Sequence, residues 1–185
     1  MMTEISLNIL DIAQNSIRAE ASIIVIDVAI DTQKDSLITI IKDNGKGMTT
    51  EQIEKSTDPF FTTRSTRKVG LGIPFFKMAA EASDGTFQIE SQVDMGTEIK
   101  AVFNLSHVDR MPLGDISSTI YTLIAFNTNI DFVFTYSYNQ KTFSLDTREF
   151  KEVLGGVDLN TPEILKYLKE YLYEGKREVD NDKML

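Results

Sequence analysis

Asp43-Asn44-Gly45-Lys46-Gly47-Met48 follows an isoleucine-rich run, residues 37–42, that is expected to form a strand. Taken alone, the stretch predicts a turn, because Asn-Gly pairs strongly favour turns after strands. The glycines also allow another interpretation, since a backbone without a Cβ can lie directly against a flat ring. Asp43 would then accept a hydrogen bond from an exocyclic amino group, which adenine carries where guanine has a carbonyl. The segments on either side must decide between these interpretations.

Upstream, residues 4–20 are expected to form a helix with Asp11 and Asn15 one turn apart on the same face. An Asn amide oxygen is a hard, neutral ligand that magnesium accepts beside water and phosphate oxygens. A carboxylate one turn away can hold those waters or polarise one of them. Two ordinary polar residues on a solvent-facing helix would give the same pattern. The pair alone therefore does not indicate a magnesium site, and the flanking motifs must decide.

Downstream, Gly70-Leu71-Gly72 immediately precede a helix expected over residues 73–82. Glycines at a helix start expose backbone N–H groups, and the helix dipole adds a positive potential that favours phosphate. Arg64 and Lys68 in the preceding loop are able to fold over a triphosphate as a lid. The segment is not a Walker loop, because no Gly-Lys-Ser/Thr follows. On its own, a glycine-rich connector beside a solvated basic patch is the simpler interpretation.

The expected elements follow one another as helix, two strands, helix, two strands over residues 4–105. This order indicates an α/β (α+β) two-layer sandwich, with helices packed on one face of a mixed, mostly antiparallel sheet. The pattern breaks at Pro112 and Gly114. We therefore expect one domain over residues 1–106 and a second, small α+β domain of unassigned function over residues 107–185.

Within the second domain, the sequence predicts a helix over residues 116–126, a hairpin of strands 132–137 and 142–145, and a helix from Thr161. The last stretch of the chain, about ten residues, is charged and is expected to fray.

The composition limits the classes of protein to which the chain can belong. Its net charge of −9 argues against a nucleic-acid partner and against an anionic membrane surface, since both favour clustered Lys and Arg. The absence of cysteine excludes disulfides, a thiol nucleophile and Cys-based metal sites. We find no secretory signal and no apolar run of roughly 18 residues, so we expect a soluble, cytoplasmic protein.

Order and spacing decide between the interpretations left open above. Asn15 precedes Asp43 by 28 residues and Asp43 precedes Gly70 by 27, with helix, two strands, loop and helix in that order. In this arrangement, residues 4–105 resemble the ATP-binding domain shared by DNA gyrase, heat-shock chaperones, histidine kinases and mismatch-repair ATPases. Within that superfamily the sequence is most similar to sensor histidine kinases. Their lid-entry motif resembles residues 58–64, their second glycine box residues 70–73, and their closing strands Ile89-Glu90-Ser91 and Gly96-Thr97.

The resemblance implies a role for each matching residue. Asn15 would ligate magnesium, and Asp43 would recognise the adenine amino group of ATP. The other nucleotide-binding residues would be Gly45, Gly47 and Thr97 around the base, and Arg18, Arg64, Lys68, Gly70, Leu71 and Gly72 around the phosphates. Asp11 stands where histidine kinases usually carry Asn and hydrolytic relatives carry Glu. It would act as a general base or as a holder of magnesium waters.

Three functions are compatible with this resemblance. The first is a Mg-ATP-binding regulatory protein that transfers phosphate to a partner protein or gates it, engaging the partner through residues 108–185. The second is a nucleotide-binding switch with little turnover, and the third is a slow ATPase that forms a homodimer when nucleotide binds. His107 is the only histidine and lies in a boundary segment. Self-phosphorylation on histidine within this chain is therefore not expected.

Overall fold

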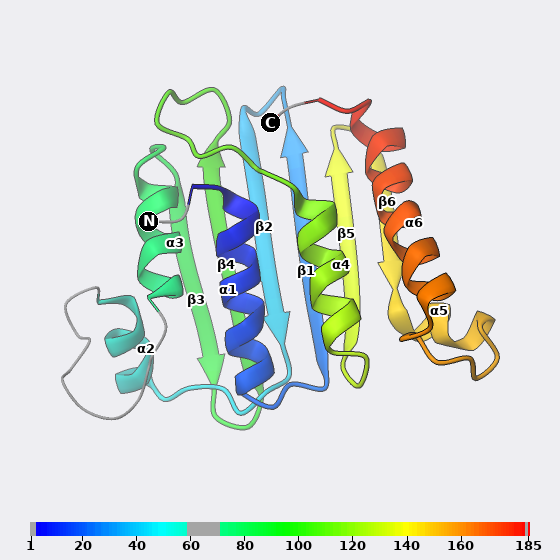
Figure 1. Ribbon diagram of the computed structural model, residues 1–185. Helices are drawn as coiled ribbons and strands as arrows, with labels where there is room; N and C mark the ends of the chain where they lie inside the picture. The colour runs from blue at the N-terminus through cyan, green and yellow to red at the C-terminus, as the bar shows by residue number, and fades with distance from the viewer. Residues whose placement is uncertain (1–2, 59–70, 184) are drawn as a thin grey trace.

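The computed structural model describes residues 3–58, 71–183 and 185. They form one layer of helices over one face of a single sheet (Figure 1). The helices are α1 (Ile5–Arg18), α2 (Thr50–Thr57), α3 (Gly72–Glu81), α4 (Ile116–Phe126), α5 (Thr147–Val153) and α6 (Pro162–Asp180). The strands are β1 (Ile23–Asp31), β2 (Ser36–Asp43), β3 (Thr86–Gln92), β4 (Gly96–Asn104), β5 (Asp131–Tyr138) and β6 (Lys141–Asp146).

The sheet has six strands in the order β3-β4-β2-β1-β5-β6. All neighbouring strands are antiparallel except β1 and β5, which are parallel. The expected fold class, a two-layer sandwich with a mixed, mostly antiparallel sheet, is confirmed.

Burial alternates along the strands, as a sheet covered on one face requires. In β1, Ile24, Ile26, Val28 and Ile30 are at most 2% exposed and face the helices, while the residues between them are half-buried on the open face. Helix α1 buries Ile5, Ile9 and Ile12 at helical spacing against this surface. The C-terminal half of α1 consequently lies over the ends of β2 and β4.

The expected division into two domains near residue 106 is revised by the strand pairing. Strand β5 pairs with β1 over eight positions, from Ile23 opposite Asp131 to Ile30 opposite Tyr138. Its side chains Phe132, Phe134 and Tyr136 are at most 2% exposed and belong to the same hydrophobic core as the β1 isoleucines. Residues 107–185 therefore extend the sheet and the core of the preceding region.

The expected fraying of the last ten residues is wrong for α6, which continues to Asp180. The Asp180 carboxylate is 1% exposed and accepts hydrogen bonds from the Tyr136 hydroxyl at 2.7 Å and from Lys176 Nζ at 2.6 Å. At the end of the chain, the carbonyl of Leu185 accepts a hydrogen bond from Leu113 N at 2.7 Å. These contacts hold the C-terminal segment against the sheet. Among the described residues, no helix combines the length and the apolarity that a membrane crossing requires.

Candidate nucleotide-binding site

A cavity of about 200 Å³ opens between α1, α2, α3 and the ends of β2 and β4. Its apolar wall is made by six side chains, Ile12, Ala19, Ile41, Met48, Ile73 and Ile99. Its polar lining comprises Asn15, Ser16, Arg18, Asp43, Ser56 and Thr97. The cavity thus combines an apolar surface with a few polar groups, which is the usual composition of a small-molecule site.

The register of the sheet explains how these surfaces arise. Thr97 of β4 lies directly opposite Asp43 of β2 on one side and Ser91 of β3 on the other. Directly opposed residues point to the same face, so the three form one polar row across three strands. Two positions further along, Ile99 lies opposite Ile41 and Ile89, which gives an apolar row next to the polar one.

Asp43 is the buried carboxylate of this site, with 8% of its surface exposed. Its Oδ2 accepts a hydrogen bond from Ser16 Oγ at 2.5 Å, and its Oδ1 accepts one from Gly45 N at 2.9 Å. Each carboxylate oxygen has a second lone pair, so Asp43 can still accept a hydrogen bond from a ligand in the cavity. Its two protein donors fix the direction in which it does so.

Ser16 is a site residue that the sequence analysis did not identify. It follows Asn15 in α1 and is 3% exposed, on the buried face of the helix one turn after Ile12. A hydroxyl at helical spacing from Ile9 and Ile12 was the available signal, because a buried polar group needs a partner. Which partner it has depends on the packing of α1 over β2.

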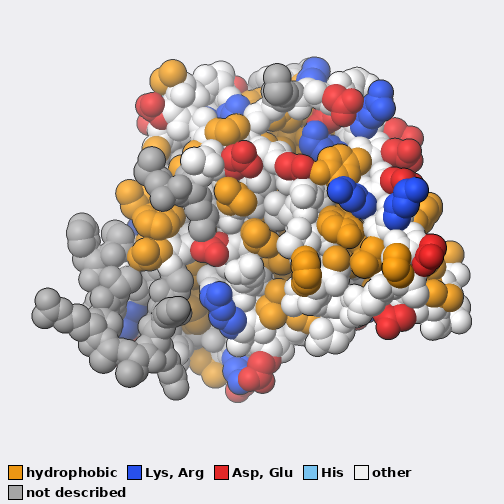
Figure 2. Space-filling view, in the orientation of Figure 1, with side chains coloured by type: hydrophobic (Ala, Val, Ile, Leu, Met, Phe, Trp, Pro, Cys, Tyr) orange, Lys and Arg blue, Asp and Glu red, His pale blue; other side chains and the backbone are white. Residues whose placement is uncertain are grey.

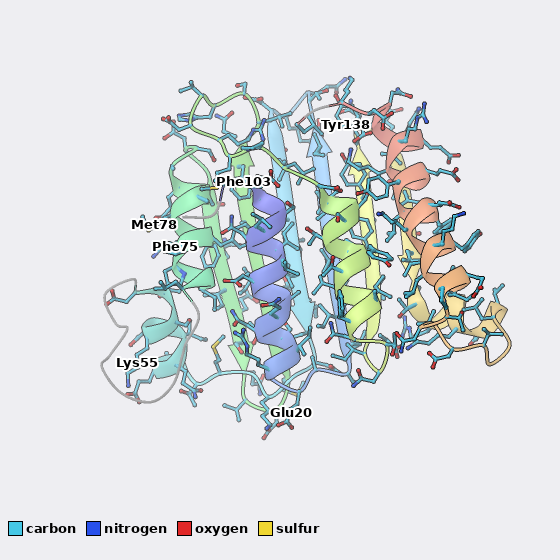
Figure 3. The ribbon with its side chains drawn as sticks, viewed as in Figure 1. Glu20, Lys55, Phe75, Met78, Phe103 and Tyr138 are labelled. Atoms are coloured by element: carbon cyan, nitrogen blue, oxygen red, sulfur yellow. The ribbon has the colours of Figure 1, made fainter. Side chains whose placement is uncertain are left out.

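The loop after β2 is held from two sides. The Asn44 side-chain oxygen accepts hydrogen bonds from the backbone N of Ser22 at 2.9 Å and of Ile23 at 3.1 Å. Lys46 N donates to Ala19 O at 2.9 Å, and Lys46 also forms an ion pair with Glu20, which Figure 3 labels at the end of α1. These contacts fix the loop against the turn between α1 and β1.

Gly47 completes the cavity wall in a conformation that favours glycine, with φ +62°. A Cβ at this position would lie 1.9 Å from the carbonyl oxygen of Gln92, the last residue of β3. Gly45 is also tightly enclosed, though less than Gly47, since a Cβ there would be 2.7 Å from Ala19 O. The stretch is therefore both a turn and part of the cavity wall, so the two interpretations of its sequence are compatible.

Asn15 and Arg18 lie together on α1 at the mouth of the cavity. The Asn15 Oδ1 atom accepts a hydrogen bond from Arg18 Nη1 at 3.0 Å. The described residues contain no group of three or more His, Cys, Asp or Glu side chains that could hold a metal ion. A magnesium ion here would therefore depend on the Asn15 oxygen together with ligand and water oxygens.

Asp11 faces the start of α3 and does not line the cavity. A Cβ built on Gly72, the first residue of α3, would lie 2.7 Å from Asp11 Oδ2. The structure thus brings a carboxylate of α1 to the positive end of the α3 dipole. Leu71, the residue before α3, is 42% exposed. The predicted phosphate-binding residues Arg64, Lys68 and Gly70 lie outside the described residues.

The profile of one protein family, the histidine kinase-, DNA gyrase B-, and HSP90-like ATPases, matches residues 2–107. The chain belongs to this family. The matched region contains α1 to β4 and every residue that lines the cavity. Membership in this ATPase family supports ATP as the ligand of the cavity.

Relatives of this chain include sensor proteins and sensor histidine kinases. A sensor protein of Shewanella frigidimarina is 34% identical over 107 residues, which cover 57% of this chain and 16% of that protein. An NtrY-like sensor histidine kinase of Rickettsia prowazekii is 32% identical over 107 residues, 58% of this chain and 18% of that protein. The chain thus spans less than a fifth of the length of these relatives.

Among solved structures, the fold is similar to that of the Aquifex aeolicus MutL ATPase domain complexed with ADP. The TM-score is 0.54 at 14% sequence identity, over 95% of this chain and 71% of that one. The coverage includes most of the residues beyond 107, so the strands and helices added after the ATPase-family match also have counterparts in a known fold.

Proposed function

We propose that this chain is a Mg-ATP-binding regulatory protein of the cytoplasm, which transfers phosphate to a partner protein or gates that partner. The observation that carries the proposal is the polar row in which Asp43 stands beside Thr97, next to the apolar row of Ile41 and Ile99. Adenine has the matching surfaces, a flat apolar ring and an edge with an amino donor. Family membership over residues 2–107 supports the same ligand.

In this proposal Asp43 accepts a hydrogen bond from the adenine amino group, and the base lies against the apolar wall beside Gly47. Asn15 supplies a magnesium ligand, and Arg18 beside it offsets phosphate charge. Leu71 and Gly72 offer backbone N–H groups at the start of α3, where the helix dipole favours anions. The remaining proposed nucleotide-binding residues are Gly45 at the base and Arg64, Lys68 and Gly70 at the phosphates.

A partner protein is proposed to bind through residues 108–185, and α1 offers the connection to the nucleotide. A groove between α1 and α4 is lined by Leu10, Ile17, Arg18 and Phe126, among others, and Arg18 lines the nucleotide cavity as well. Phe126 is 81% exposed. Hydrophobic side chains also gather over α4 and between α4 and α6 on the helix face (Figure 2). A protein covering this face would contact the helix that binds the nucleotide.

The binding step is tested by isothermal titration calorimetry with ATP and magnesium. The wild-type chain is expected to bind, with an affinity that falls when magnesium is chelated. Asp43→Ala is expected to abolish measurable binding, because it removes the acceptor for the amino group. Asp27→Ala, on the open face of β1, serves as a matched control with wild-type affinity. Tight ATP binding by Asp43→Ala would overturn the adenine assignment.

The fate of the γ-phosphate is tested separately, with labelled ATP and purified candidate partners. Label on a partner supports phosphate transfer. Nucleotide-dependent binding of the partner without label supports gating, in which ATP and ADP favour different conformations of the chain.

A slow ATPase that dimerises on nucleotide binding is a second candidate, favoured by the position of Asp11. Its carboxylate lies at the start of α3, where the terminal phosphate of a nucleotide bound in the cavity would approach. Asp11→Asn should then remove hydrolysis and spare ATP binding. Unchanged turnover in this variant would exclude Asp11 as the general base. Sedimentation with and without nucleotide tests the homodimer.

A further inference from the structure

Ser91 occupies the end of the polar row and contacts three groups around the cavity. Its Oγ lies 2.8 Å from Met48 N, 2.9 Å from Gly96 O and 2.8 Å from the Thr97 hydroxyl oxygen. Met48 and Thr97 both line the nucleotide cavity, whereas Ser91 does not. Ser91 therefore connects the Met48 and Thr97 parts of the cavity wall without lining the cavity itself.

The protons of these groups can be assigned from their chemistry. A serine hydroxyl has one proton to donate and two lone pairs that accept. The Met48 N–H can only donate to Ser91, and the Gly96 carbonyl can only accept from it, so the single Ser91 proton is directed to Gly96. The contact with Thr97 must then be donated by Thr97. The proton of the Thr97 hydroxyl is thus used within the protein.

This assignment determines what Thr97 presents to the cavity. With its proton directed to Ser91, the Thr97 oxygen faces the ligand as an acceptor. It lies opposite Asp43 in the sheet register, and Asp43 is itself held by two donors, Ser16 and Gly45. The polar side of the cavity therefore offers two neighbouring acceptors to one edge of the base.

We propose that Ser91 is a positioning residue for purine specificity, which fixes the Thr97 hydroxyl as an acceptor and so favours a 6-amino over a 6-oxo purine nucleotide. The inference rests on the proposed function, since it concerns the same cavity. An amino group can donate to both acceptors, whereas a 6-oxo group would place a third acceptor against them. A site built to pair with one group discriminates strongly against an analogue that leaves its partners unpaired.

The experiment compares the dissociation constants of ATP and ITP by calorimetry in the presence of magnesium. The two nucleotides differ at position 6 of the purine, so the ratio of their constants isolates the contacts proposed here. The variants are Ser91→Ala, which frees the Thr97 hydroxyl to rotate and donate, and Ser91→Thr, which keeps the hydroxyl. Ser144→Ala provides a matched control on the exposed side of edge strand β6.

In the wild-type chain, ATP is expected to bind more tightly than ITP. Ser91→Ala is expected to lower this preference roughly fivefold, which corresponds to a hydrogen bond of about 1 kcal/mol. Ser91→Thr and Ser144→Ala are expected to retain the preference. A general loosening of the cavity would weaken both nucleotides equally and leave the ratio unchanged, so an unchanged ratio in a folded Ser91→Ala variant overturns the inference.

Two further outcomes keep the inference separate from the proposed function. If the wild-type chain binds no ATP, the proposed function fails, and the inference fails with it. If ATP binds but Ser91→Ala does not fold, Ser91→Cys supplies the test, because a thiol nearly keeps the side-chain volume but is only a weak hydrogen-bond partner for Thr97. A lowered preference for ATP in Ser91→Cys supports the inference, and an unchanged preference overturns it.

Discussion

Asp43 and Asp180 are both buried carboxylates, 8% and 1% exposed, in opposite halves of the same molecule. Asp43, at the end of β2, accepts hydrogen bonds from two protein donors and also lines a cavity. Asp180, at the end of α6, is enclosed by Tyr136, Lys176 and the backbone N of Asp182. A buried carboxylate that faces a cavity is suited to a ligand, whereas one enclosed by donors of its own chain stabilises the fold.

The largest expected effect on stability lies at Asp180. Asp180→Ala leaves Lys176 and the Tyr136 hydroxyl without their buried partner, and removing one member of a buried ion pair costs about 3 kcal/mol or more. Urea denaturation should show this loss in the free energy of unfolding. ATP affinity below the unfolding transition should stay at the wild-type value. A loss of ATP affinity in the folded variant would contradict the assignment of Asp180 to stability alone.

Two glycines also separate an effect on stability alone from an effect on ATP binding, with a smaller change in the free energy of unfolding. A Cβ at Gly175 of α6 would lie 2.2 Å from the Phe143 ring, and one at Gly47 would lie 1.9 Å from Gln92 O. Both Gly175→Ala and Gly47→Ala should lower the free energy of unfolding by about 2 kcal/mol, because the neighbours must move. Only Gly47→Ala should also weaken ATP binding. Glu174→Ala, an exposed neighbour on α6, should change neither quantity.

The Tyr136 hydroxyl, which donates to Asp180, makes the free energy of unfolding depend on pH. Burial, together with the hydrogen bond to Asp180, raises the pKa of Tyr136 well above its ordinary value. The folded state then holds this proton more tightly than the unfolded state, so its stabilisation is complete below the unfolded pKa near 10 and is lost as the pH rises above it. Tyr136→Phe should lose less stability than wild type between about pH 9 and pH 11. Parallel urea titrations of the two proteins over this range measure the difference, and identical slopes would contradict it.

Much of the cavity follows from local sequence, and the rest depends on tertiary pairing. The α1 helix, the two hairpins and the loop after Asp43 were predictable, because helical spacing, strand alternation and Asn-Gly turns are local signals. The parallel pairing of β5 with β1 was not, since strands more than 100 residues apart leave no local trace of their register. The short helix α5 was missed for another reason, because seven residues show too little of a helical period to be recognised.

The hydroxyl groups show the same limit at the level of single residues. The sequence did not single out Ser16, and Ser91 entered only as part of the closing-strand resemblance. Their roles appear when α1 is placed over β2 and β3 is paired with β4. Ser91 left one usable signal. A hairpin that turns between Gln92 and Gly96 places Ser91 opposite Thr97, so the β3–β4 turn alone would have made them neighbours.

The central claim is that Asp43 recognises the adenine of a nucleotide bound over Ile41 and Ile99. A crystal structure of the chain with a non-hydrolysable ATP analogue and magnesium tests it most directly. The claim predicts the adenine amino nitrogen within about 3.2 Å of an Asp43 carboxylate oxygen, with the ring against the apolar row. A nucleotide bound elsewhere, such as in the groove between α1 and α4, or an amino group directed away from Asp43, would contradict it.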